Sequence, residues 1–176
     1  TKLSLEISTP AGSQLRELSQ ALLQEQFKAV GVDLVINNVP AATLFGNWAE
    51  NGKLKRGDFD IVMDTWGADL DPDDFLSTLF TSDQIPTEAN GGEGWNFFRL
   101  IDPALDRAIA DGRASLDQNA RKAAYKTAAE RIADNIIYIP LYKRSVIDAF
   151  RSTVTGQQPN PWAEFTWNAQ DWTRTR

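Results

Sequence analysis

The stretch Asp60-Ile-Val-Met-Asp-Thr-Trp-Gly-Ala-Asp-Leu-Asp-Pro-Asp-Asp-Phe75 runs from an apolar strand through a turn into the start of a helix. The turn carries a tryptophan, a glycine and an acid at Trp66, Gly67 and Asp69. In open α/β sheets, small molecules bind in the crevice beyond the carboxyl ends of the strands. We therefore expect these residues to lie at the rim of a ligand site.

The chain before this stretch alternates strand patterns with helix patterns. An apolar stripe of Leu15, Leu18, Leu22, Leu23 and Phe27 marks the first helix, which Gly31 ends. Strand patterns fall at 2–8, 32–36 and 59–63, and a second helix starts near Pro40. This order predicts an α/β fold with parallel strands and right-handed crossovers.

Two Asp-Pro steps mark further helix starts, at Asp71-Pro72 and Asp102-Pro103. Asp73 and Asp74 follow in the first turn, where acids complement the positive helix end. The spacing of Asp69, Asp71 and Asp73 also matches the start of an EF-hand calcium loop, but Asp74 occupies the loop position that requires glycine. Capping therefore explains the acids from Asp71 onward and leaves Asp69 free to face the crevice.

The second half of the chain predicts a helix at about 117–135 with a small-residue stripe, then closing strands at 136–142 and 145–150. The stripe consists of Ala120, Ala124, Ala128 and Ala129. No regular element is predicted for the tail after residue 153. The dense basic group of Lys53, Lys55 and Arg56 is interpreted as a solvated loop.

Composition excludes several classes of function. The net charge of −6 disfavours a nucleic-acid partner, which needs clustered basic residues. The chain has no Cys and no His, so thiol nucleophiles, imidazole bases and the usual zinc sites are excluded. Asp64 and Asp69 could serve a glycosidase, but acids this close to a strand end are more often structural. We expect no catalytic residue, no cofactor and no metal site.

No apolar run approaches the roughly 20 residues of a membrane span, and no signal-peptide pattern opens the chain. The sequence instead begins directly with a strand pattern at residues 2–8. We interpret this abrupt start as that of a fragment from a longer protein, whose export signal would lie outside this chain.

Four stretches together resemble the second lobe of the family 5 extracellular solute-binding proteins, the dipeptide, oligopeptide and nickel receptors of ABC importers. They are residues 1–31, 59–72, 96–106 and 121–142, and the last three are specific in their order and spacing. The resemblance implies a type II periplasmic-binding-protein-like lobe with a mostly parallel sheet flanked by helices. It also implies a ligand-binding lobe at 1–158 and a tail at 159–176 that returns toward a missing N-terminal lobe.

The resemblance implies a function as well. Receptors of this family close two lobes over a ligand by a hinge motion and deliver it to an ABC permease outside the cytoplasmic membrane. In peptide-binding members, the acid matching Asp69 pairs with the ligand's ammonium, and the main chain around Thr65 and Gly67, including Ala68, pairs with the peptide backbone. Trp66 would flank a side-chain pocket.

Alternatives stay open at this point. An oligosaccharide receptor of the same family would use Trp66 for sugar stacking, and the absence of His makes nickel a poorer fit. Related lobes also occur as ligand-sensing domains of transcription regulators, although no helix-turn-helix segment is visible here. An enzyme is the least favoured class.

Overall fold

The computed structural model describes residues 2–67, 70–143, 145, 147–161 and 163–175. The chain divides into two compact units, Thr1–Ile137 and Tyr138–Arg176. The resemblance implies a different boundary, between a ligand-binding lobe at 1–158 and a tail at 159–176. That boundary refers to the intact receptor and stays a prediction.

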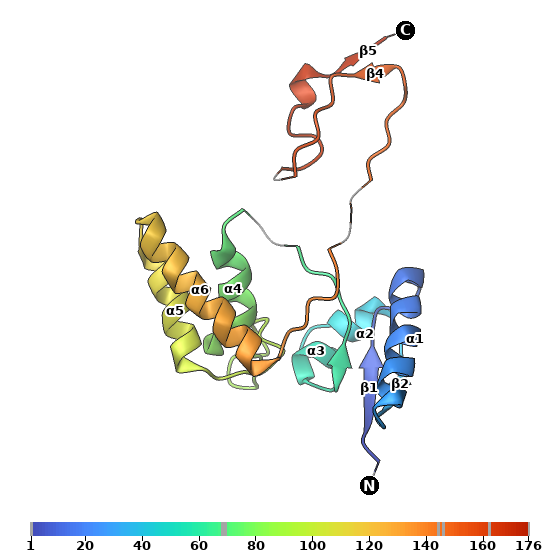
Figure 1. Cartoon of the computed structure of the whole chain (residues 1–176), viewed down its shortest axis with the longest axis vertical. Coiled ribbons are helices and arrows are strands. Elements are labelled where there is room, and N and C mark those ends of the chain that lie inside the picture. The colour runs from blue at the N-terminus through green and yellow to red at the C-terminus, as the bar shows by residue number, and fades with distance from the viewer. Residues whose placement is uncertain (1, 68–69, 144, 146, 162, 176) are drawn as a thin grey trace. The chain divides into compact units, whose positions relative to one another are not determined.

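A three-stranded parallel sheet forms one part of the first unit (Figure 1). Its strands are β1 (Ser4–Ser8), β2 (Asp33–Ile36) and β3 (Ile61–Val62), in the order β2-β1-β3. Helix α1 (Gln14–Ala29) connects β1 to β2, and Ile7 pairs with both Ile36 and Ile61 across the ladder. The α/β fold with parallel strands is confirmed, although β3 is shorter than its sequence pattern.

The sheet core forms around Ile7, Leu34 and Met63, and Leu23 and Phe27 of α1 pack against it. The prediction for the rest of the α1 stripe is wrong. Leu15, Leu18 and Leu22 are 49%, 59% and 68% exposed, whereas Gln20 is fully buried. At 3.6 residues per turn, Gln20, Leu23 and Phe27 share one helix face, and the three exposed leucines lie about half a turn away.

The basic group also differs from its interpretation as a solvated loop. Helices α2 (Ala41–Phe45) and α3 (Lys53–Arg56) lie between β2 and β3. Each cation of α3 contacts a different segment: Lys53 pairs with Glu6 of β1 at 2.9 Å, Lys55 donates to the Gly94 carbonyl at 2.7 Å, and Arg56 donates to the Trp48 carbonyl at 3.1 Å. These contacts tie α3 to the sheet and to the later loop.

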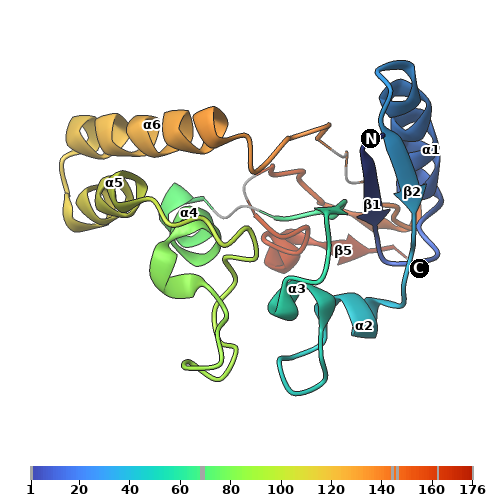
Figure 2. The same cartoon turned by 90° about the horizontal axis from the view of Figure 1, so that it is seen from below.

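Three longer helices form the other part of the first unit: α4 (Pro72–Phe80), α5 (Pro103–Ala114) and α6 (Gln118–Asn135), with a short 3-10 turn η1 (Ser82–Gln84) after α4. Figure 2 shows α5 and α6 running side by side. Both predicted caps are confirmed, since Asp71 accepts from the Asp73 N–H and Asp102 accepts from the Ala104 and Leu105 N–H groups.

The close approach of α5 and α6 depends on a glycine more than on the predicted alanine stripe. Ala128 is fully buried, but Ala120 and Ala129 are exposed. A Cβ placed on Gly112 of α5 would lie 2.7 Å from ring atoms of Tyr125, a buried residue of α6. The glycine therefore leaves the space that the tyrosine ring fills.

The N-terminus of α4 is fastened to this helix pair by ion pairs. Arg121 of α6 donates to the Asp71 carboxylate at 2.7 Å and to the Gly112 carbonyl at 2.9 Å. Asp73 accepts from Arg113 of α5 at 2.9 Å and from the Tyr125 hydroxyl at 3.2 Å. The acids predicted as helix caps thus also hold the three helices together.

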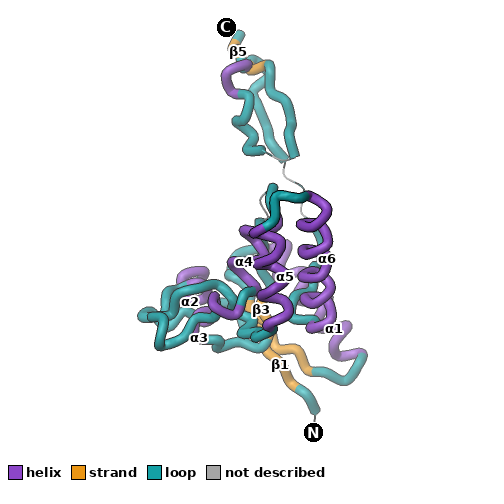
Figure 3. Tube along the Cα trace, turned by 90° about the vertical axis from the view of Figure 1, so that its left-hand side faces the viewer, coloured by secondary structure: helices purple, strands orange, loops and turns teal. Residues whose placement is uncertain are grey.

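The second unit is mainly loop (Figure 3), with a two-residue antiparallel ladder of β4 (Val154–Thr155) and β5 (Thr173–Arg174) and a 3-10 turn η2 (Ala169–Asp171). Asn168 is fully buried and bonds the Gly156 carbonyl at 2.7 Å and the Trp172 indole at 3.0 Å. These two bonds join Gly156, just after β4, to Trp172, just before β5.

The closing strands predicted at 136–142 and 145–150 are wrong for the residues that the structure describes there. Ile139, Leu141 and Ile147 are 67%, 50% and 89% exposed. An apolar β pattern forms a strand only when a neighbouring strand supplies hydrogen bonds and a face to pack on. Among the described residues these segments have no such neighbour.

Gly112→Val is expected to lower the free energy of unfolding by about 2 kcal/mol, because the added side chain overlaps the Tyr125 ring. Urea denaturation measures the change. Asp111→Val adds the same side chain at an exposed position of α5 and should cost much less. A loss for Gly112→Val no larger than that for Asp111→Val would show that the close approach to Tyr125 does not set the cost.

Candidate ligand-binding site

A buried polar network fixes the carboxyl ends of the three parallel strands. The Thr9 hydroxyl, just after β1, donates to the Met63 carbonyl just after β3 at 2.8 Å. The Thr9 N–H donates to the Asn38 side chain after β2 at 3.1 Å, and the Asn38 and Gln20 amides bond each other in both directions at 2.9 Å. These bonds fix the edge of the sheet at which β3 ends. The turn that carries Trp66 and Gly67, which we call the rim turn, begins there.

Arg16 lies in the first turn of α1 at this same edge. Its Nη2 donates to the Thr65 hydroxyl at 3.2 Å and lies 3.9 Å from the Asp64 carboxylate. The Arg16 side chain is only 18% exposed. A guanidinium has five N–H donors, and among the described residues only the Thr65 bond is formed. Arg16 therefore retains donors for an anionic group.

Among the described residues, Asp64 is the acid that pairs with Arg16, but its carboxylate does not occupy the N–H donors of the guanidinium. Burial raises the pKa of the Asp64 carboxyl, and the Thr65 N–H and the Arg16 charge offset that effect only in part. The separation of 3.9 Å is longer than a charge-assisted hydrogen bond. Asp64 therefore balances some of the Arg16 charge and leaves its hydrogen-bonding capacity open.

Aromatic rings form the next part of the rim. Trp66 packs against the second apolar cluster of Leu44, Leu54 and Phe97. Trp95 meets Trp66 edge to face, with ring centroids 5.7 Å apart and planes at 87°, and lies 5.6 Å from the Phe97 ring. Trp95 is 43% exposed. We call Trp66, Trp95 and Phe97 the aromatic corner.

The predicted site residues are only partly within the described structure. Thr65 and Gly67 are exposed, and a Cβ built on Gly67 would meet no atom within 4 Å, so the main chain there is open to a ligand. Trp66 is half-buried in the aromatic corner. Ala68 and Asp69 lie outside the described residues.

Sequence reasoning missed Arg16 and Trp95. Arg16 could have been found from topology, because a helix that follows a parallel strand begins at the carboxyl edge of the sheet. Trp95 lies 29 positions beyond Trp66 in a segment without periodicity, and no local pattern places it beside the rim. Only the folded chain brings these rings together.

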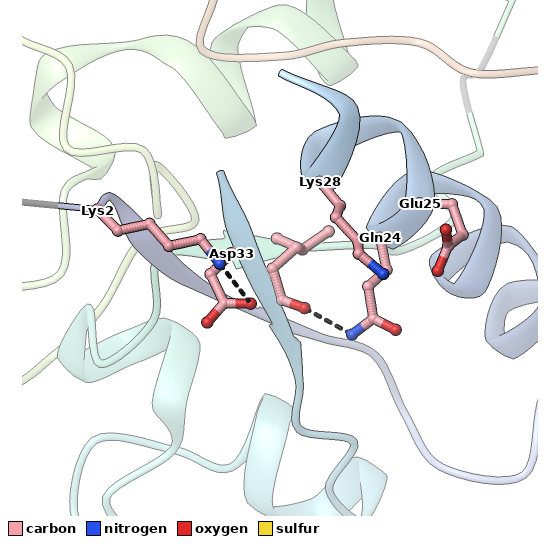
Figure 4. Close-up of a pocket in the computed structure, with 6 residues that line it drawn as sticks. Lys2, Gln24, Glu25, Lys28 and Asp33 are labelled. Atoms are coloured by element: carbon pink, nitrogen blue, oxygen red, sulfur yellow. Dashed lines mark hydrogen bonds and ion pairs between the residues drawn. The ribbon is translucent and has the colours of Figure 1, made fainter. Parts of the chain in front are cut away.

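A hollow of about 220 Å³ lies at the start of β2, lined by Lys2, Gln24, Glu25, Lys28, Asp33 and Leu34 (Figure 4). Lys2 and Asp33 pair across it at 4.0 Å, and Gln24 donates to the Leu34 carbonyl at 2.6 Å. Asp33 begins β2, so this hollow is at the end of the strand opposite to the rim. Lys2 and Asp33 neutralise each other there, and the hollow shares no residue with the rim.

Within the described ranges, no group of three or more Asp, Glu, His or Cys side chains is arranged to hold a metal ion. In the same residues, none of the helices has the length and apolar character needed to cross a membrane.

Residues 1–87 match the family described as bacterial extracellular solute-binding proteins, family 5 middle. The probable di/tripeptide-binding protein 5 of Pseudomonas aeruginosa is 31% identical over 86% of this chain and 27% of that protein. Di/tripeptide-binding protein 2 of the same organism is 29% identical over 100% of this chain and 30% of its own length.

Among solved structures, NikZ of Campylobacter jejuni, in complex with Ni(L-His), superposes with a TM-score of 0.74 at 26% identity. That match covers 98% of this chain and 33% of the NikZ chain. This chain thus spans about a third or less of the relatives that it matches.

The parallel sheet, its rim turn and these relatives define the class: an extracellular solute-binding protein of the α/β, periplasmic-binding-protein type. More specifically, the chain belongs to family 5 of these proteins.

Asp64→Asn is expected to unfold at a higher urea concentration than the wild type at pH 7. A carboxyl whose pKa is raised on folding destabilises the protein when ionised, so stability falls as pH rises from about 4 through the folded-state pKa. The advantage of the variant should therefore shrink toward pH 4. An advantage independent of pH would contradict this account, and Asp58→Asn, at an exposed position, is the matched control.

Proposed function

We propose that this chain is part of the substrate-binding component of an ABC importer and that the intact receptor binds short peptides. The observation that carries the proposal is Arg16, a largely buried guanidinium that forms one hydrogen bond, to Thr65, within the part of the chain that the structure describes. Charged hydrogen bonds of this kind recognise carboxylates, and a free peptide ends in one.

The other end of the peptide is assigned to Asp69, which would pair with the ligand's ammonium. The open main chain at Thr65 and Gly67 would pair with the peptide backbone as an added strand, and Trp66 would bound a side-chain pocket. A cation beside Thr65 and an acid four positions later in the sequence would suit a zwitterionic ligand. Two of the relatives are named for di- and tripeptides, which supports a short one.

The remaining parts of the receptor follow from the family. The ligand would be enclosed between this lobe and a second lobe by hinge closure, so that binding energy stabilises the closed state. The receptor would act outside the cytoplasmic membrane and pass its ligand to a membrane permease, without catalysis. A relative is named a periplasmic nickel-binding protein, which supports the extracytoplasmic location.

An oligosaccharide is the second candidate ligand, because Trp66 and Trp95 form an aromatic corner of the kind that stacks on sugars. A neutral sugar, however, would bring no anion to Arg16, whose charge Asp64 balances only in part. The peptide is therefore the better match to the rim.

Isothermal titration of the full-length protein with di- and tripeptides tests the assignment of Arg16. Amidation of the peptide's C-terminus should weaken binding about 10- to 100-fold, because a charge-assisted hydrogen bond is lost. Arg16→Gln should bind the free-acid and amidated peptides almost equally. Arg107→Gln, which changes an exposed arginine of α5, should keep the wild-type preference. If Arg16→Gln also kept it, Arg16 would not be the carboxylate partner.

A second pair of variants separates the ligand classes. Asp69→Asn should weaken peptide binding about 10-fold or more and leave any sugar binding unchanged. Trp66→Ala should abolish binding of an oligosaccharide if that is the true ligand. Thermal stabilisation of the protein by an oligosaccharide panel, with no response to peptides, would overturn the peptide proposal.

A further inference from the structure

The ammonium of Lys55 lies against the aromatic corner. Its Nζ is 5.2 Å from the Trp95 ring centroid and 5.8 Å from that of Phe97, and it donates to the Gly94 carbonyl at 2.7 Å. Trp95 in turn contacts Trp66 of the rim. A positive charge is therefore built into the wall that a ligand side chain would meet at Trp66.

This charge has no direct acidic partner among the described residues. The acid whose charge acts on Lys55 is Glu93, which is exposed and raises the pKa of the lysine, while burial lowers it and is the larger effect. Arg99 adds a second cation nearby, donating to the Lys55 carbonyl at 2.7 Å. Lys55 thus places a positive charge against the rings of the aromatic corner, although the net charge of the chain is negative.

Two effects make this corner unfavourable for a cationic ligand. The negative faces of Trp95 and Phe97 already interact with the Lys55 ammonium, so a second cation at the same rings gains less from them. Direct repulsion between two ammonium groups adds to this, whereas a carboxylate would be attracted.

We propose that Lys55 is a specificity-determining residue, which biases the aromatic corner toward ligands with an acidic or neutral side chain and against lysine and arginine side chains. The proposal rests on the peptide-binding function and adds a class of preferred peptide to it. It assigns a ligand-selecting role to a residue of the basic group, whose three cations otherwise tie α3 to neighbouring segments.

The expected size of the bias follows from the distances. A charge within roughly 8 Å of the ammonium, in the intermediate dielectric of a partly closed site, changes a binding constant by about tenfold. Ligands that differ only in the sign of one side-chain charge should therefore differ by about tenfold or more in affinity.

The test uses the full-length protein and the tripeptide Ala-Ala-Ala, together with its variants carrying Glu, Gln or Lys at each position. At the ligand position that meets the corner, wild-type protein should bind the Gln peptide about tenfold more tightly than the Lys peptide, and the Glu peptide more tightly still. Lys55→Met should reduce this difference to about twofold or less. Lys126→Met, at an exposed lysine of α6, should leave it unchanged.

Lys55→Arg provides a second variant that retains the charge and should retain the preference, so the proposal stays testable even if Lys55→Met does not fold. A wild-type protein that prefers the Lys peptide, or Lys55→Met with an undiminished preference, would overturn the role of Lys55 while peptide binding itself stands. No binding of any tripeptide would instead reject the proposed function.

Discussion

The hydrogen bond from the Thr9 hydroxyl to the Met63 carbonyl is the contact on which the site depends, because it joins the ends of β1 and β3 at the place where the rim turn begins. The sheet has few strands, and β3 pairs with β1 through only two register positions, Ile7 with Ile61 and Ser8 with Val62. With Gln20 and Asn38, Thr9 fixes this edge by polar bonds that are partly or fully buried. The geometry of Arg16 and Thr65 follows from that edge.

The helical part of the first unit is fixed at Asp71, which follows the rim turn in the sequence. Asp71 begins α4 and is bound by Arg121 of α6, which also contacts α5 through the Gly112 carbonyl. The two ends of the connection between β3 and α4 are thus each met by an arginine, Arg16 at Thr65 and Arg121 at Asp71.

Several expectations followed from local pattern and were confirmed: the parallel α/β order, and the capping roles of Asp71 and Asp102. The errors share one cause. Leu15 was assigned to the buried side of α1 because leucine is apolar, yet Gln20 holds that side through its bond to Asn38. Lys55 was assigned to solvent because it is charged, yet it is bonded to Gly94. In both cases a distant partner decided the outcome.

The sequence by itself determined the class of fold and the helix caps, because these depend on periodicity and on residues near in the chain, and its resemblance to known proteins indicated the family. Only the tertiary structure decided which side chains meet at the rim. Arg16 reaches Thr65 across 49 positions, and Trp66 reaches Trp95 across 29. Whether such residues meet depends on how the helices pack on the sheet, and that packing is a sum over many weak contacts that no local pattern contains.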